Sequence, residues 1–279
     1  MNRSFSAKII LFGEHSVVRG GQALAIPFTR FAGEWVTEGA PKAEWNPLIR
    51  FLVAHPELEI DVARLEKDLS RGGGFISDIP QGKGLGSSGA LVAGLLTHYG
   101  PDREWSVQDA QKRLASLEAY YHGQSSGIDP LVSWRGKPFL ITGTEVKEVA
   151  VPVTQWQGLD RWFLLDSGVA RHSAPLIAVF KRKTEDPAFA QSFGDLKALV
   201  DEAIESYEHL DEVMMGVTMR ALSKLQLECM SEMIPAGLRE IWAQGLASGE
   251  FALKLCGAGG GGFFTGYRLK SYPREVLKF

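Results

Sequence analysis

A glycine- and serine-rich segment, Gly84-Leu85-Gly86-Ser87-Ser88-Gly89, precedes the apolar run Ala90–Leu96. The run has the composition of a buried helix, and the dipeptide Gly100-Pro101 is expected to end it. Free backbone N–H groups and the positive end of the helix dipole make a helix N-terminus an anion site. Glycine lets a phosphate approach the backbone, and a serine hydroxyl can hold a phosphate oxygen or a metal ion. The segment predicts a phosphate-binding loop.

The same glycines are also compatible with simpler interpretations. Their spacing satisfies the dinucleotide pattern G-x-G-x-x-G, but the residues before them end in Pro80, which is unsuited to a central strand. Gly82-Lys83 is followed by Gly84, so the P-loop signature is missing too. Taken alone, the segment could also be a glycine-rich turn that binds no ligand, although phosphate binding is favoured.

Charged groups lie at both ends of the first apolar segment. Lys8 opens the predicted strand Ala7–Phe12, and the pair Glu14-His15 comes after Gly13. Active-site groups commonly lie in the loops at the ends of strands, although a surface lysine and a turn glutamate would look the same.

Two carboxylates stand near the small-residue loop that follows Tyr121. Glu118 lies on a predicted helix, and Asp129 ends the loop just before Pro130. Near a phosphate site, one carboxylate can hold Mg²⁺ while the other orients or deprotonates an acceptor hydroxyl. The alternatives are a solvated helix face for Glu118 and an ordinary turn for Asp129.

A second glycine-rich segment follows the predicted strand Phe251–Cys256 and contains four consecutive glycines, Gly259–Gly262. Four glycines cost backbone entropy, so a passive role is poorly motivated. Because glycines cover a neighbouring side chain poorly, we expect Cys256 to be the accessible thiol. We expect Cys229, on a predicted helix, to be buried and inert.

The elements that must position these residues alternate between short strands and helices with brief gaps, which favours an α+β protein of two domains. A linker at 152–158 divides the chain into predicted domains 1–157 and 158–279. The expected strands are 7–12, 22–26, 31–36, 137–141, 145–151, 162–166, 251–256 and 263–267. The expected helices are 47–54, 62–69, 90–96, 106–121 with Ser106 as N-cap, and most of 174–249.

The amino-acid composition limits the classes of partner that this protein is expected to bind. The 279 residues include 45% hydrophobic and 23% charged residues, with a formal net charge of −3. This charge gives no basic field for nucleic acid, and no apolar run is long enough to span a bilayer. Two cysteines suit a reducing compartment and supply no disulfide framework. We expect a cytoplasmic protein, monomeric or homodimeric, with a small-molecule partner and without nucleic-acid or membrane partners.

Taken together, the segments Lys8–Gly20, Pro80–Ala90 and Lys254–Gly262 resemble, in order, the three motifs of the GHMP kinase superfamily. The first motif, the loop His122–Asp129 and the segment Asp166–Ser173 look most like the mevalonate kinases. This resemblance implies a two-domain α+β fold with a ribosomal S5 domain 2-like N-terminal domain and a ferredoxin-like C-terminal domain.

The resemblance also implies residue roles. Asp129 would be the catalytic aspartate, and Lys8 would stabilise the developing alkoxide. Ser88 and Glu118 would hold Mg²⁺ between the ATP phosphates. Glu14 and His15 would line the acceptor pocket, with Arg171 near the substrate carboxylate. The ATP-binding residues would be Gly84, Leu85, Gly86, Ser87, Ser88, Gly89, Gly257, Ala258, Gly259 and Gly260.

The implied activity is phosphorylation of the 5-hydroxyl of mevalonate by ATP and Mg²⁺. Another GHMP kinase activity, on phosphomevalonate or a sugar, is the alternative. Three residues depart from the superfamily pattern. Gly89 replaces the usual alanine and Cys256 the usual threonine or serine, and we expect both to be tolerated. Phe263 follows the glycine run where a small residue or cysteine is usual.

Overall fold

The computed structural model describes residues 3–151, 159–169, 173–270 and 277–278. Contacts divide the chain into two compact units. Unit 1 comprises Met1–Lys8, Pro27–Gln81 and Leu85–Lys137, and unit 2 comprises Ile9–Ile26, Gly82–Gly84 and Pro138–Phe279. The predicted linker 152–158 lies outside the described residues, and the division into domains 1–157 and 158–279 stays a prediction.

Five strands form one sheet, in the order β1-β2-β4-β5 with β3 also paired to β2. Their bounds are β1 Ser4–Phe12, β2 Gln22–Val36, β3 Gly74–Ser77, β4 Phe139–Thr142 and β5 Glu145–Glu148. The sequence predicted two strands where the structure has the single strand β2. Its ends pair with different partners, Gln22–Ala25 with β4 and Gly33–Val36 with β3, which explains the two separate hydrophobic patterns.

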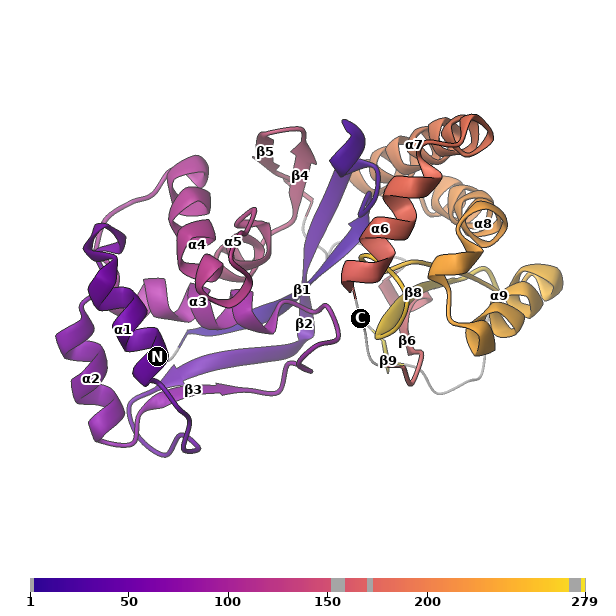
Figure 1. The fold of residues 1–279 in the computed structure, drawn as a ribbon. Coiled ribbons are helices and arrows are strands. Elements are labelled where there is room, and N and C mark those ends of the chain that lie inside the picture. Colours follow the sequence, from indigo (N-terminus) through magenta and orange to yellow (C-terminus); the bar gives the residue numbers. More distant parts are fainter. Residues whose placement is uncertain (1–2, 152–158, 170–172, 271–276, 279) are drawn as a thin grey trace. The chain divides into compact units, whose positions relative to one another are not determined.

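The helices of unit 1 are α1 Asn46–Ala54, α2 Val62–Ser70, α3 Ser87–Tyr99, α4 Val107–His122 and α5 Ile128–Arg135. Helices α3, α4 and α5 pack against one another (Figure 1). Most residues of α3 are buried, as its continuous apolar sequence predicts. Four of the five helices match predicted ones. Helix α5 was not predicted, because Asp129-Pro130 was interpreted as the end of a loop.

Local sequence signals fix the ends of these helices. The Ser106 hydroxyl accepts the Asp109 N–H at 3.1 Å and donates to its carboxylate at 2.7 Å. This reciprocal contact confirms the predicted N-cap of α4. Gly100 follows the last residue of α3 and donates its N–H to the Leu96 carbonyl, so the predicted end of that helix is also confirmed.

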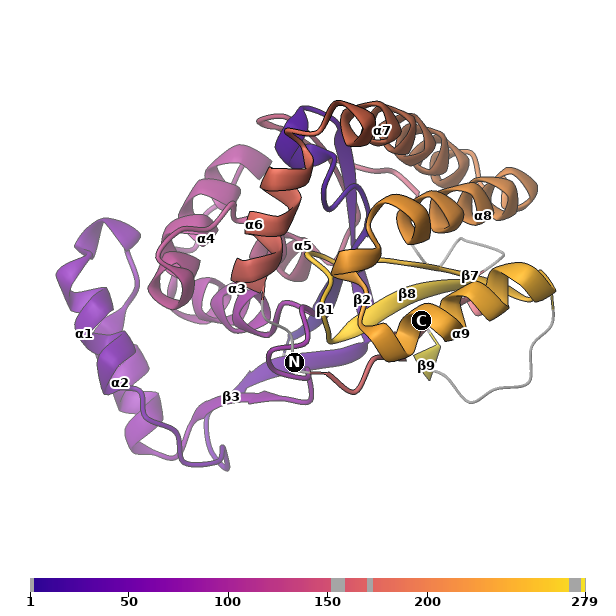
Figure 2. The ribbon, with the colours of Figure 1, turned by 45° about the vertical axis from the view of Figure 1, so that its right-hand side comes forward.

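Unit 2 contains an antiparallel sheet in the order β7-β8-β6-β9. The helices α8 and α9 lie alongside it in Figure 2 and contact β7, and α7 packs against α8. The strands are β6 Trp162–Asp166, β7 Phe251–Lys254, β8 Phe263–Arg268 and β9 Leu277–Lys278. The helices are α6 Ser173–Lys183, α7 Pro187–Glu208, α8 Glu212–Cys229 and α9 Ala236–Ser248. Mixed sheets and helices in both units confirm the α+β class.

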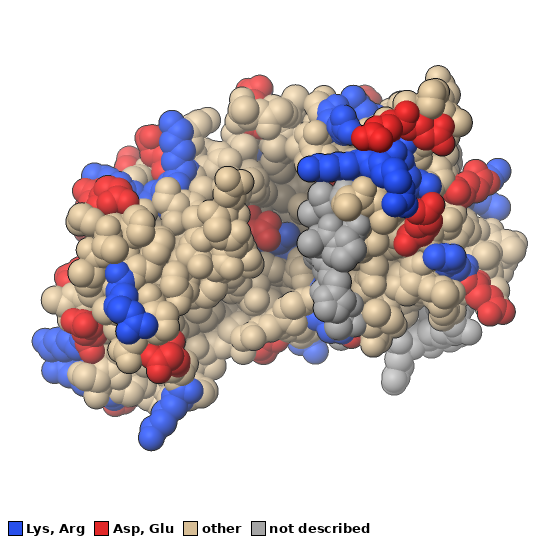
Figure 3. Space-filling view, in the orientation of Figure 1, with Lys and Arg blue, Asp and Glu red and all other residues tan. Residues whose placement is uncertain are grey.

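Acidic and basic side chains are interspersed over the face shown in Figure 3. Such a mixed surface agrees with the small formal net charge of −3. Within the part of the chain that the structure describes, no helix is both long enough and apolar enough to cross a membrane.

Candidate functional site

The predicted phosphate loop leads directly into a helix. Helix α3 begins at Ser87, with Gly86 as its N-cap in the left-handed region at φ 76°. The Lys8 N–H donates to the Leu85 carbonyl at 3.0 Å, which ties the loop to β1. A Cβ at Gly86 would come within 2.9 Å of Lys8 Cγ, so only glycine leaves room for this lysine. The first N–H groups of α3 therefore lie beside the predicted catalytic lysine.

Lys8 and Asp129 form an ion pair within unit 1. The ammonium lies 2.8 Å from the carboxylate, and the two side chains are 7% and 33% exposed. Asp129 is in the first turn of α5, where the helix dipole favours negative charge. The structure thus brings together the two residues predicted to be catalytic, although they are far apart in sequence.

Gly89 determines how closely α3 approaches α5. A Cβ at this position would lie 2.8 Å from the Pro130 nitrogen and 2.9 Å from the Asp129 carbonyl carbon. Both atoms belong to the backbone, which cannot move aside as a flexible side chain can. The absence of a side chain at Gly89 thus allows the close packing that positions Asp129.

Ser88 and Glu118, the predicted Mg²⁺ ligands, are hydrogen-bonded to each other. The Ser88 hydroxyl donates to the Glu118 carboxylate at 3.1 Å, and His122 Nε2 lies 3.1 Å from the same hydroxyl. Ser125 donates to the other carboxylate oxygen. Burial, followed by the nearby Asp129 charge, raises the pKa of Glu118, and the serine hydrogen bonds oppose this shift.

This donor set fits Mg²⁺. Among the described residues, no group of three His, Cys, Asp or Glu side chains could hold a metal ion by itself. Mg²⁺ typically takes one or two carboxylates and completes its shell with substrate phosphates and water. Glu118 is buried without an ion-paired lysine or arginine in the described part of the chain. A bound cation would supply the missing positive charge.

Glu14 and His15 line a cavity of about 610 Å³ within unit 2. The lining is largely apolar, and the His15 ring packs on Phe180 with ring centroids 4.9 Å apart. Gly257 and Ala258, predicted to contact ATP, border the same cavity. The other lining residues are Ile10, Val18, Arg19, Leu176, Lys181, Glu185 and Met233. Arg171, the predicted contact of the substrate carboxylate, lies outside the described residues.

A buried ion pair holds Glu14 in place. Lys254 Nζ lies 3.0 and 3.2 Å from the two Glu14 carboxylate oxygens, and it also donates to the Leu255 carbonyl. The side chains are 1% and 3% exposed. The sequence analysis assigned Lys254 no partner. A lysine inside the otherwise apolar segment 251–255 was the signal for a buried acidic partner.

The second glycine-rich segment packs closely against its surroundings. A Cβ at Gly260 would lie 2.2 Å from Leu176 Cδ1 on α6, and one at Gly259 would lie 2.6 Å from the Met233 carbonyl oxygen. Both glycines have positive φ, 81° at Gly259 and 75° at Gly260. Close packing therefore leaves no room for a side chain at either position. This reason for the two glycines was not predicted from the sequence. Their contact with ATP stays a prediction.

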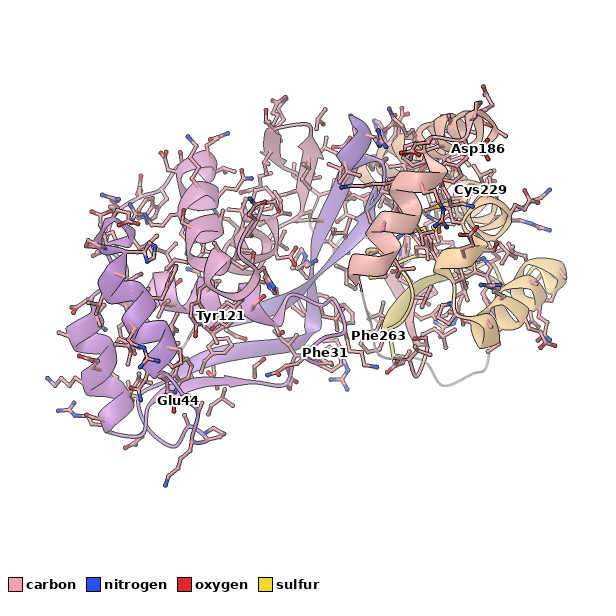
Figure 4. All side chains as sticks on the ribbon, viewed as in Figure 1. Phe31, Glu44, Tyr121, Asp186, Cys229 and Phe263 are labelled. Atoms are coloured by element: carbon pink, nitrogen blue, oxygen red, sulfur yellow. The ribbon has the colours of Figure 1, made fainter. Side chains whose placement is uncertain are left out.

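The expected accessibility of the two thiols is wrong. Cys256 is buried with 4% exposure, because it follows β7 directly into the interior of unit 2. Cys229, labelled at the end of α8 in Figure 4, is the more exposed thiol. Partial burial raises its pKa to about 11, so little reactive thiolate forms at neutral pH.

Residues 58–137 match the family model described as GHMP kinases N terminal domain. The chain is 28% identical to the mevalonate kinase of Pyrococcus abyssi, over 93% of this chain and 86% of the relative. It is 27% identical to the mevalonate kinase of Archaeoglobus fulgidus, over 95% and 92%.

Solved structures of mevalonate and phosphomevalonate kinases are similar in fold to this chain. The Methanococcus jannaschii mevalonate kinase superposes with a TM-score of 0.68 and 18% identity, covering 95% of this chain and 89% of that one. The Streptococcus pneumoniae phosphomevalonate kinase gives a TM-score of 0.64 and 16% identity, covering 95% and 90%. Since the two TM-scores are close, the fold alone does not select the acceptor.

Proposed function

We propose that this chain, a GHMP kinase that transfers phosphate to the hydroxyl of a small molecule, acts on the 5-hydroxyl of mevalonate. ATP would be the phosphate donor and Mg²⁺ the cofactor. Support for mevalonate comes from the two relatives named mevalonate kinase, which match this chain along nearly its whole length. The product would be 5-phosphomevalonate.

The observation that carries this proposal is the ion pair between Lys8 and Asp129, at 2.8 Å and beside the first turn of α3. A carboxylate there can accept the proton of an acceptor hydroxyl. The ammonium would stabilise negative charge that develops on the acceptor oxygen. In phosphoryl transfer most catalysis comes from such positioning and charge stabilisation.

The remaining predicted residues have supporting roles in this proposal. Ser88 and Glu118 would hold Mg²⁺, which neutralises charge on the phosphate oxygens when bound. The loop Gly84–Gly89 would bind the triphosphate through backbone N–H groups, with Gly257–Gly260 contributing further contacts. Glu14, fixed by Lys254, and His15 would contact the acceptor, and Arg171 its carboxylate.

Phosphomevalonate is the second candidate acceptor, because Arg19 and Lys181 both line the cavity that holds Glu14 and His15. A phosphorylated acceptor needs cationic partners for its phosphate, and guanidinium and ammonium groups both serve. Glu185 lines the same cavity and would oppose a second phosphate there. The proposal therefore favours mevalonate.

The test is ADP release from ATP and Mg²⁺ with mevalonate, phosphomevalonate, galactose and homoserine as separate acceptors. Mass spectrometry of the products would confirm the site of phosphorylation. We expect kcat/KM to be highest for mevalonate by at least about a hundredfold, since a mismatched polar group in a pocket costs that much or more. A preference for phosphomevalonate would replace the first candidate with the second.

A further inference from the structure

Lys83 has a specific partner at the end of β6. Its ammonium lies 2.9 and 3.0 Å from the two carboxylate oxygens of Asp166. Asp166 also accepts the Gly168 N–H at 3.0 Å, so its carboxylate is fixed by the turn that follows the strand. All these residues belong to unit 2. The lysine is thus held by a carboxylate that is itself held in place.

Phe263 completes the arrangement. Strands β6 and β8 are paired so that Asp166 lies directly opposite Phe263, and Figure 4 labels Phe263 at the start of β8. The Lys83 ammonium lies 5.8 Å from the centre of the Phe263 ring, within range of a cation–π contact. A Cβ at Gly262 would lie only 3.1 Å from the Lys83 carbonyl oxygen. Lys83 therefore packs against the second glycine-rich segment as well.

Lys83 is the single side chain in the segment Gly82-Lys83-Gly84, and both glycines have positive φ, 70° and 83°. Glycines in this region lack side chains that could hold a loop in one conformation. The Lys83 and Asp166 side chains are 26% and 44% exposed, and exposed ion pairs add little to global stability. The consequence of this pair is therefore the local position of the loop.

We propose that Lys83 and Asp166 are positioning residues, which together with Phe263 fix the first arm of the phosphate loop against the second glycine-rich segment. The arm leads within a few residues to the N–H groups at the start of α3. Holding it in one conformation lowers the entropy that binding a triphosphate would otherwise remove. This inference rests on the proposed function in taking ATP as the donor.

The alternative is that Lys83 leaves Asp166 and contacts a phosphate itself. The two roles give opposite results for Asp166→Asn. If Lys83 is a positioning residue, losing its partner weakens ATP binding. If it is a direct ligand, Asp166→Asn frees the ammonium, and ATP binding stays equal or becomes tighter.

The experiment measures ATP binding by calorimetry, without acceptor, for the whole protein and for Lys83→Met, Asp166→Asn and their combination. We expect each single change to raise the Kd for ATP about tenfold and the combination to raise it no further, because the pair acts as a unit. The exchanged pair, Lys83→Asp with Asp166→Lys, should recover part of the affinity. Turnover at saturating ATP should change by less than about twofold.

Lys147→Met is the matched control. Lys147 forms an exposed ion pair with Glu145 at 2.9 Å on the β4–β5 hairpin. The substitution should leave the Kd for ATP unchanged. A variant Asp166→Asn that binds ATP as tightly as the unchanged protein, or additive effects in the combination, would overturn the inference. Failure of the unchanged protein to bind ATP would instead reject the proposed donor, so the two failures are distinguishable.

Discussion

Two carboxylates of unit 1 lie near each other in different surroundings. Asp129 is paired with the Lys8 ammonium at 2.8 Å and is partly exposed. Glu118 is buried and hydrogen-bonded to serines, with a raised pKa. Unequal environments of this kind let neighbouring carboxylates take different tasks. We therefore assign proton acceptance to Asp129 and metal binding to Glu118.

Asp129→Asn tests the first assignment. An amide cannot accept the acceptor proton, so we expect kcat to fall by about 10²–10⁴ while ATP binding and thermal stability change little. Steady-state kinetics and calorimetry measure the two effects separately. Asp102→Asn, at an exposed position of unit 1, is the control and should keep full activity. Turnover above about a tenth of the original would contradict the assignment.

Glu118→Gln tests the second assignment, metal binding by Glu118, first through the pH dependence of thermal stability. The fold raises the pKa of Glu118 above its usual 4.5, chiefly by burial, so the fold favours the protonated form. That contribution to stability is present below the unfolded pKa and is lost as pH rises through the folded value. Without metal, Glu118→Gln should therefore gain thermal stability relative to the unchanged protein as the pH rises above about 4.5, the usual pKa of this carboxyl.

The same variant should need a higher Mg²⁺ concentration for half-maximal activity, by about tenfold or more, since a neutral amide is a weaker ligand. Melting curves at several pH values and a Mg²⁺ titration provide the two measurements. A folded Glu118→Gln with unchanged Mg²⁺ dependence would place Glu118 outside the metal site.

At the scale of the elements, sequence signals located most of the strands and helices because those signals are local. Ser106 and Asp109 mark the start of α4, and Gly100 marks the end of α3. Helix α5 was missed because Pro130 suggested a break, although proline is tolerated in the first turn of a helix. Pairings between distant residues, such as Lys254 with Glu14, depend on tertiary packing and left only a weak signal.

Gly89→Ala is the prediction at this scale. Alanine normally favours a helix over glycine by about 1 kcal/mol, but here its Cβ would meet backbone atoms of α5 at 2.8 and 2.9 Å. We expect lower thermal stability and a lower kcat, because α5 and Asp129 must shift. The sequence analysis expected this position to tolerate either residue, and the close contact now favours glycine.

Gly237→Ala is the matched control for that change. Gly237 lies in the first turn of α9, and a Cβ there would meet nothing within 4 Å. It should leave activity unchanged and raise stability by a few tenths to about 1 kcal/mol. If Gly89→Ala and Gly237→Ala behave alike in melting and turnover, the close approach of α3 and α5 does not constrain Asp129, the proposed catalytic aspartate.

At the scale of the whole molecule, two compact units share strands β1 and β2, because each strand contributes residues to both. A ligand that binds the folded chain and not the unfolded one raises the free energy of unfolding by mass action. At a concentration one hundred times its Kd, a ligand stabilises the folded form by about 2.7 kcal/mol. For a chain of this size such a gain corresponds to a rise in melting temperature of several degrees.

The melting temperature in the presence of ATP reports nucleotide and metal binding without any contribution from catalysis. If Ser88 and Glu118 hold Mg²⁺ as proposed, ATP with Mg²⁺ should raise the melting temperature by about 5 °C or more, and ATP with a chelator should raise it much less. Asp129→Asn should keep the full rise, since it removes only the proposed proton acceptor. Glu118→Gln should lose the part that depends on Mg²⁺. An equal rise with and without the chelator would show that Glu118 binds no metal in the nucleotide complex. The proposed roles of Glu118 in metal binding and of Asp129 in proton acceptance would then fail as a pair.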